Sequence, residues 1–209
     1  MNKITKEFME HFTNKFQHHG PTPKGVDWGD NEETVLLRYS KMLSVKDSYN
    51  EPITLLDVGC GYGGLYEYAK EKGITLKYTG IDVSLPMIQY AQDKYKDTED
   101  ITFICKDIFD FDTDKKFDYI VCNGILTQKL SASIIEMDTY AHSLIKKMYE
   151  LCNIGIAFNL LTTKVHYMVS HSYYRNPVEL FAYCLNEFTN KIKIDHSYLL
   201  YEYTMYLYK

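Results

Sequence analysis

The segment that most constrains this chain of 209 residues is a glycine-rich run that directly follows a short apolar stretch. Residues 53–58 are apolar enough to form a buried strand, and Gly59, Gly61, Gly63 and Gly64 follow its end. Glycine lets a backbone turn sharply and approach a ligand closely. A helix expected from Leu65 would present free N–H groups and the positive end of its dipole there. The run therefore predicts a strand–turn–helix unit that holds an anionic group.

Strands and helices are predicted to alternate after this run, because apolar stretches of strand length recur between segments with helical spacing. Strands are expected at residues 53–58, 76–81, 101–105, 117–122, 153–160, 191–195 and 202–208, and helices at about 65–72, 84–95, 131–151 and 177–189. This order predicts an α/β fold with a mainly parallel sheet covered by helices on both faces. The connection between the last two strands is too short for a helical crossover, so they should pair antiparallel.

Two more helices are predicted before the first strand. Phenylalanines recur at helical spacing within residues 5–18. A loop with the only tryptophan, Trp28, comes next. Asp30 with Glu33 is typical of a capping box, which predicts a helix over residues 30–45.

Polar side chains stand at the ends of four predicted strands: Asp57, Asp82, Asp107 and Asn123. In a sheet of this kind, ligands bind beyond the carboxyl ends of the strands. There Asp57 can hold the ammonium group of an amino acid, Asp82 can accept from both hydroxyls of a ribose, and Asp107 can accept from the amino group of adenine. The row therefore predicts a site for a nucleoside with a charged tail.

The glycine spacing alone leaves a second ligand class open. Gly59, Gly61 and Gly64 also satisfy the G-x-G-x-x-G pattern of dinucleotide-binding enzymes, and an acid in the position of Asp82 occurs in NAD sites too. Asp57 argues against that class, because a pyrophosphate has no need of a negative charge two residues before the first glycine.

Together these segments resemble the class I methyltransferases that use S-adenosylmethionine (SAM), over residues 53–160. The resemblance implies a Rossmann-like sandwich with a seven-stranded, mostly parallel sheet and an antiparallel C-terminal strand. It also implies a single methyltransferase domain over residues 1–209. Residues 1–48 would form a helical lid that caps the substrate, and residues 49–209 would form the SAM-binding core.

The resemblance implies SAM as the cofactor and S-adenosylhomocysteine (SAH) as the product. The loop of Asp57, Gly59 and Gly61, with Cys60 inside it, would hold the methionine moiety. The other implied contacts are Asp82 at the ribose, Asp107 and the backbone of Ile108 at the adenine amino edge, Val83 and Met87 on the adenine ring, and Asn123 near the sulfonium. Val83 and Met87 are equally compatible with plain core packing.

Three residues outside these segments are further candidates. Arg38 on the second helix is expected to pair with the SAM carboxylate, and Trp28 to cover the cofactor, although Trp28 also fits a purely structural place in the lid. His171 lies in a polar, aromatic stretch, residues 164–175, that is expected to overhang the acceptor pocket. It is the candidate catalytic base, while loop histidines are commonly just solvated.

Charge and composition exclude several function classes. The formal net charge of −5 repels a polyphosphate backbone, which argues against nucleic acid as a partner. The segment Asn123–Leu126 lacks the Pro-Pro-aromatic run of DNA base methyltransferases. The five cysteines form no C-x-x-C pair, so no metal site or disulfide framework is expected. Residues 1–16 have no signal-peptide core and no apolar run is long enough for a bilayer, so a cytoplasmic protein without a membrane partner is expected.

We therefore expect a methyltransferase that moves the methyl group of SAM to a small-molecule acceptor, such as a sugar or a natural-product intermediate. The alternatives are an RNA or protein methyltransferase, an NAD-dependent oxidoreductase, and a non-catalytic SAM-binding partner subunit. The sequence does not select the acceptor, the methylated atom or the oligomeric state.

Overall fold

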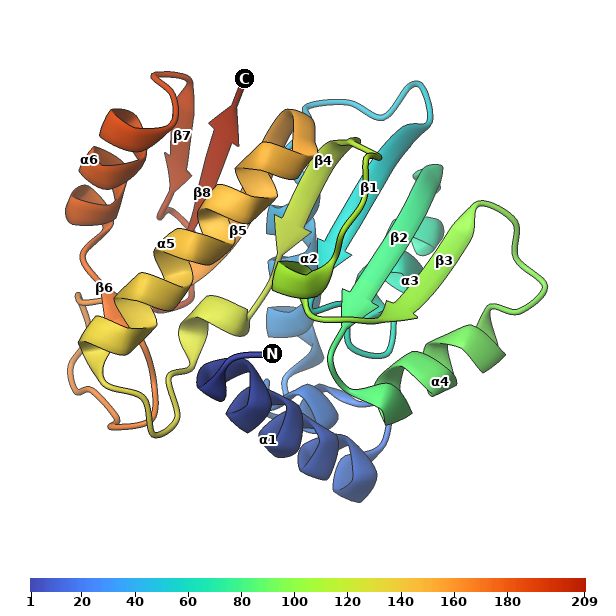
Figure 1. The fold of residues 1–209 in the computed structure, drawn as a ribbon, viewed down its shortest axis with the longest axis horizontal. Helices are drawn as coiled ribbons and strands as arrows, with labels where there is room; N and C mark the ends of the chain where they lie inside the picture. Colours follow the sequence, from blue (N-terminus) through green and yellow to red (C-terminus); the bar gives the residue numbers. More distant parts are fainter.

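A computed structural model describes residues 1–209 and places one central sheet between helices on both faces (Figure 1). The strand order is β3-β2-β1-β4-β5-β8-β7, and a short β6 pairs with β5. The strands are β1 (Ile53–Val58), β2 (Leu76–Asp82), β3 (Ile101–Cys105), β4 (Phe117–Cys122), β5 (Cys152–Thr162), β6 (Tyr174–Arg175), β7 (Ile192–Asp195) and β8 (Glu202–Tyr208). β8 is the one strand that runs in the opposite direction to all the others, so it pairs antiparallel with both β5 and β7. The predicted fold class is confirmed, with β6 as an eighth strand that the sequence did not reveal.

Six α-helices and three 3-10 helices connect these strands. They are α1 (Lys3–His19), η1 (Pro23–Val26), α2 (Glu32–Leu43), α3 (Gly64–Glu71), α4 (Leu85–Lys94), η2 (Ile108–Asp110), η3 (Ile125–Thr127), α5 (Ile134–Leu151) and α6 (Pro177–Glu187). Figure 1 shows α5 and α6 in front of the sheet and α2 and α3 behind it. None of these helices has the length and apolar character needed to cross a bilayer.

The core lies on both faces of the sheet, because successive side chains of a strand point to opposite faces. In β1, Leu55 belongs to the core cluster that includes side chains of α2, α3 and α4, whereas Leu56 belongs to the cluster on the other face, which includes side chains of α5 and α6, and both are fully buried. Burial on both faces explains why the central parallel strands read as continuous apolar runs. Because these strands are parallel, the polar residues at their carboxyl ends lie together at one edge of the sheet.

One helix cap differs from the prediction, and a second has its side chain engaged elsewhere. The side chain of Asn31, not Asp30, caps α2 by accepting from the backbone N–H groups of Glu33 and Thr34, at 2.9 and 3.4 Å. Asp30 instead pairs with Lys24. Ser84 stands at the N-cap of α4, but its hydroxyl bonds Thr13 on α1 at 2.8 Å.

That contact helps to hold α1 beneath the carboxyl ends of the parallel strands, at the edge toward which their arrows point in Figure 1. The loop with η1 continues from α1 along the same edge. The N-terminal segment therefore covers the edge at which the sequence places its candidate site.

Candidate active site

A pocket lies at the carboxyl ends of β1, β2, β3 and β4 and is covered by α1 and η1. It holds about 940 Å³ of space between the protein atoms, part of it open to solvent. Its walls include eleven of the thirteen residues predicted to bind or act on a ligand: Trp28, Asp57, Gly59, Cys60, Gly61, Asp82, Val83, Met87, Asp107, Ile108 and Asn123. Arg38 and His171 are not among the lining residues.

The glycine loop after β1 is shaped by backbone contacts to β2. The N–H groups of Gly59 and Cys60 donate to the carbonyl of Ile81, at 2.8 and 3.1 Å. Gly59 has a φ of 76°, and a methyl group on it would lie 2.6 Å from the Ile125 side chain. Only glycine fits there, so the loop can pass close to the pocket and deliver the free N-terminal N–H groups of α3 to it.

Asp57 is a buried carboxyl at the end of β1, with only 2% of its surface exposed. Burial raises its pKa to about 7, and the nearby Asp82 adds to that rise. The Tyr78 hydroxyl donates to Asp57 Oδ2 at 2.6 Å, which lowers the pKa and limits the shift. A cationic ligand group in the pocket would favour the ionised form.

Asp82 ends β2 and is held by backbone N–H groups on both oxygens. Oδ2 accepts from Gly61 at 2.9 Å and Oδ1 accepts from Ser84 at 2.8 Å. Burial raises the pKa of Asp82, and these backbone bonds oppose the rise. The carboxylate thus has a fixed orientation at the pocket wall, with lone pairs left to accept from ligand hydroxyls.

Three residues of the pocket wall, Thr5, Asp107 and Asn123, have buried polar atoms without a hydrogen-bond partner within the chain. Asp107 caps η2 through Oδ1, which accepts from Phe109 N–H at 3.0 Å, while Oδ2 is buried and unpaired. Asn123 is 7% exposed, and both its amide oxygen and its amide nitrogen are buried without a hydrogen bond. Because unpaired buried polar atoms are rare and costly, these atoms indicate a ligand with matching donors and acceptors.

Arg38 does not take the place expected for it. Its guanidinium donates to the Glu202 carboxylate, with Nε–Oε1 at 2.9 Å and Nη2–Oε1 at 2.5 Å. It lies beside Trp28, whose ring lines the pocket, with the guanidinium carbon 5.2 Å from the ring centroid. Glu202 thus engages the group that was expected to meet a cofactor carboxylate.

His171 also differs from its expected place. Its side chain is exposed, and its backbone carbonyl accepts from the N–H groups of Lys129 and Leu130, at 2.8 and 2.9 Å. No residue of 164–175 lines the pocket. This segment pairs with the η3–α5 connection, as the bridge between Gln128 and Ser172 shows, and so lies to one side of the pocket.

Sequence reasoning missed the aromatic residues that complete the pocket. Phe8 and Phe12 of α1, Tyr39 of α2 and Tyr140 of α5 all line it. Phe8 packs edge-on against Tyr140 with ring centroids 5.9 Å apart. The helical spacing of the phenylalanines indicated an apolar face but not its partner. No local signal in the sequence joins α1 to α5.

Known proteins show the family of the chain. Residues 50–202 match a family described as a methyltransferase domain. The Mycobacterium tuberculosis protein Rv1506c, which is named as a methyltransferase, is 31% identical over 74% of this chain and 92% of its own length. An Eschscholzia californica enzyme, named (S)-tetrahydroprotoberberine N-methyltransferase, is 34% identical over 43% of this chain and 25% of its own length.

Solved structures share the fold at low sequence identity. Magnesium protoporphyrin IX methyltransferase from Synechocystis, crystallised with bound SAM, superposes with a TM-score of 0.69. The match covers 100% of this chain and 98% of that one at 15% identity.

The fold and the matching family define the class of protein: a class I SAM-dependent methyltransferase. The chain belongs to the methyltransferase domain family matched by residues 50–202. The NAD-dependent reading of the glycine loop is therefore set aside. The unpaired Asp107 and Asn123 atoms, together with the buried Asp57 carboxyl, fit a nucleoside that carries a cationic amino-acid tail.

Proposed function

We propose that this methyltransferase acts on a small-molecule acceptor and that its SAM site is the pocket at the carboxyl ends of β1 to β4. The observation that carries the proposal is the set of unpaired buried atoms on Asp107 and Asn123 within that pocket. In a folded chain such atoms need partners, and no protein group supplies them.

Each wall residue has a distinct task in this proposal. SAM supplies a methyl group on a positively charged sulfur, so the bond to be broken is already activated. Asp57 binds the ammonium of the amino-acid tail, and the N-terminus of α3 with the Gly59–Gly61 loop binds its carboxylate. Asp82 binds the ribose hydroxyls. Asp107 Oδ2 accepts from the adenine amino group.

The remaining wall residues orient the reactants and exclude water. Val83 and Met87 pack against the adenine ring. Asn123, whose amide can donate and accept at once, orients a polar group next to the reacting methyl. Trp28 and the phenylalanines of α1 close the pocket from solvent, which supports in-line transfer by restricting the positions of both reactants.

The cover over the pocket favours a small acceptor over a macromolecule. The α1 and η1 segments lie across the pocket, so a folded RNA or protein substrate would have to displace them. The net charge of −5 also disfavours RNA. The Eschscholzia californica relative and the Synechocystis enzyme are both named for small-molecule substrates. A sugar or a natural-product intermediate fits these limits.

Calorimetric titration with SAM, SAH and NAD tests the cofactor part of the proposal. We expect binding of SAM and SAH and none of NAD. A panel of sugars, phenols, amines and bulk tRNA, assayed for SAH release, then tests the acceptor class. Turnover with tRNA that exceeds turnover with every small molecule would contradict the proposal.

A further inference from the structure

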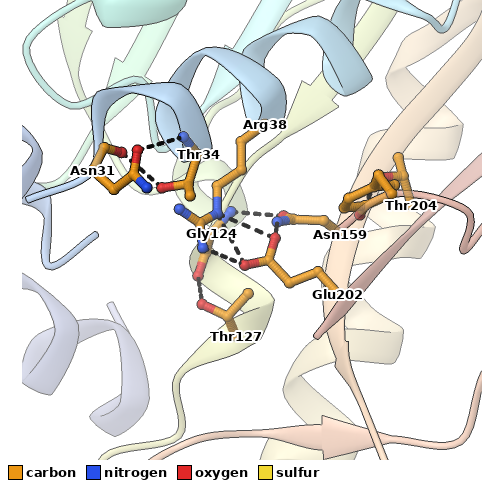
Figure 2. Close-up of polar contacts among 9 residues, drawn as sticks. Asn31, Thr34, Arg38, Gly124, Thr127, Asn159, Glu202 and Thr204 are labelled. Carbon is orange, nitrogen blue, oxygen red and sulfur yellow. Dashed lines mark hydrogen bonds and ion pairs between the residues drawn. The ribbon is translucent and has the colours of Figure 1, made fainter. Parts of the chain in front are cut away.

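A closed ring of contacts stands behind one wall of the pocket and joins segments from both ends of the chain. Figure 2 shows Arg38 of α2 hydrogen-bonded to Glu202 at the start of β8, and Glu202 hydrogen-bonded to Asn159 of β5. Asn159 Nδ2 donates to Glu202 Oε2 at 2.7 Å, and Asn159 Oδ1 accepts from the backbone N–H of Gly124 at 2.8 Å. The ring of contacts links α2 to the turn after β4.

Trp28 completes the ring. The guanidinium carbon of Arg38 lies 5.2 Å from the centroid of the Trp28 indole, within range of a cation–π contact. Gly124 lies close to the indole nitrogen, because a methyl group on it would be 2.9 Å from Trp28 Nε1. Gly124 has a φ of 88°, so both its conformation and this close approach require glycine.

The charged members of this ring of contacts are buried, so breaking their ion pair would cost more than it would at the surface. The side chain of Glu202 is 4% exposed and that of Arg38 is 15% exposed. A charge in such a place needs its partner, because losing one member leaves the other uncompensated in a poorly solvated site. The third guanidinium nitrogen, Nη1, is buried without a hydrogen bond, so Glu202 and the Trp28 ring hold the guanidinium.

The ring acts on the pocket through two of its members. Trp28 and Gly124 line the pocket, and Gly124 directly follows Asn123, whose amide is unpaired. Thr127 closes the same turn, with its hydroxyl donating to the Gly124 carbonyl at 2.6 Å (Figure 2). The position of the Asn123 amide therefore depends on a turn that Asn159 and Trp28 hold from behind.

We propose that Arg38, Glu202 and Asn159 are positioning residues for methyl transfer. They hold Trp28 and the Asn123–Gly124 turn in their working positions before any ligand binds. Arg38 thus serves the site through Trp28 and Glu202 and does not itself touch the cofactor. The functional part of this inference rests on the proposal that the pocket binds SAM, whereas the structural part does not.

A second ion pair offers a matched control. Lys41, one turn further along α2, donates to Asp195 of β7 at 2.8 Å and so also fastens α2 to the C-terminal hairpin. Neither Lys41 nor Asp195 lines the pocket or contacts the ring. If Arg38 merely anchors α2, replacing Lys41 should have the same effect as replacing Arg38.

The test uses time-resolved fluorescence anisotropy, because Trp28 is the only tryptophan and reports on the ring without a label. In the free wild-type protein, the fast local component of the decay should be small and should not change when SAH is added. Arg38→Met should at least double that component and raise the SAH dissociation constant at least fivefold. Lys41→Met should match the wild type in both readouts.

The double variant Arg38→Met with Glu202→Gln covers the case in which a lone buried carboxylate prevents folding. It should show the same two changes as Arg38→Met. The proposal is overturned if the double variant keeps wild-type anisotropy or wild-type SAH affinity, or if Lys41→Met reproduces its changes. It is also overturned, with no variant needed, if SAH must bind before Trp28 becomes rigid. Because the anisotropy of the free protein involves no ligand, a failure of SAM binding would remain a separate result.

Discussion

Binding of SAH should strengthen as the pH rises from about 6 to 7, and Asp57→Asn should abolish that rise. The pKa of the buried Asp57 carboxyl is raised to about 7 in the free protein. The ammonium group of SAH binds the ionised carboxylate, which is about 9% of the protein at pH 6 and about half at pH 7. The association constant should therefore increase about fivefold over that unit of pH.

Calorimetry in two buffers of different ionisation enthalpy measures the same effect as proton release. At pH 6, about 0.9 proton per SAH should leave the protein. Asp57→Asn keeps an acceptor for the Tyr78 hydroxyl, so the fold should survive, while binding becomes weaker and flat with pH. The nucleoside 5′-methylthioadenosine has no amino-acid tail and should bind wild type without the rise.

Two results would refute this reasoning. Wild-type affinity for SAH that is flat between pH 6 and 7 would show that Asp57 does not titrate on binding. An equal rise with 5′-methylthioadenosine would show that the titration does not depend on the ammonium group. The first result would refute the raised pKa of Asp57, and the second would refute its assigned contact with the ammonium group, while the fold and the family would stand.

The same carboxyl gives the free protein a pH-dependent stability of known sign. Because the pKa of Asp57 is higher in the folded state, about 7, than its ordinary value of 3.8, the folded protein binds more protons than the unfolded chain between those values. The contribution of Asp57 to the free energy of unfolding should then fall with rising pH, by up to about 1.4 kcal/mol per pH unit in that window. Denaturation of wild type and Asp57→Asn at pH 5 and 7 should reveal the difference.

Three substitutions test the other assignments. Asp82→Asn should weaken SAM binding by about 2 kcal/mol through loss of charge-assisted hydrogen bonds, and calorimetry showing affinity within twofold of wild type would contradict its ribose role. His171→Ala should leave both SAM affinity and turnover unchanged, because the side chain is exposed and outside the pocket lining; a large loss of turnover would restore it as a base. Asp118→Ala should lower the free energy of unfolding by about 1–3 kcal/mol and leave SAM affinity intact, because Asp118 accepts from the backbone and hydroxyl of Thr54 across β1 and β4.

The fold was predictable because its signals are local. The ranges predicted for β3 and β4 match the observed bounds, since each is an apolar run with polar or turn residues on both sides. The placement of Asp57, Asp82, Asp107 and Asn123 followed from one topological fact, that parallel strands end at a common edge. Where a residue's place depends only on the strand that carries it, the sequence is sufficient.

The misplaced residues depend on packing between distant segments. His171 follows β5 in the chain, but the loop turns aside to pair with the η3–α5 connection. The phenylalanines of α1 reach the pocket because of the angle at which that helix crosses the edge of the sheet. The spacing of apolar residues in the sequence does not predict that angle. Trp28 lies at the pocket because it follows Asp27, the C-cap of η1, whose carboxylate accepts from Lys15 and contacts His11 of α1.

Arg38 is the instructive case, because its partner was visible in the sequence without being recognised. Glu202 opens a strand that, apart from Thr204, is apolar or aromatic up to Tyr208, and it is buried along with that strand. Acidic residues are almost never fully buried unless they are paired, so a glutamate within a predicted core strand demands a cation or several donors. Among the candidates, an arginine on a helix that covers the same sheet can supply two parallel N–H groups. A search for the partner of Glu202 would therefore have led to Arg38, and away from a cofactor carboxylate.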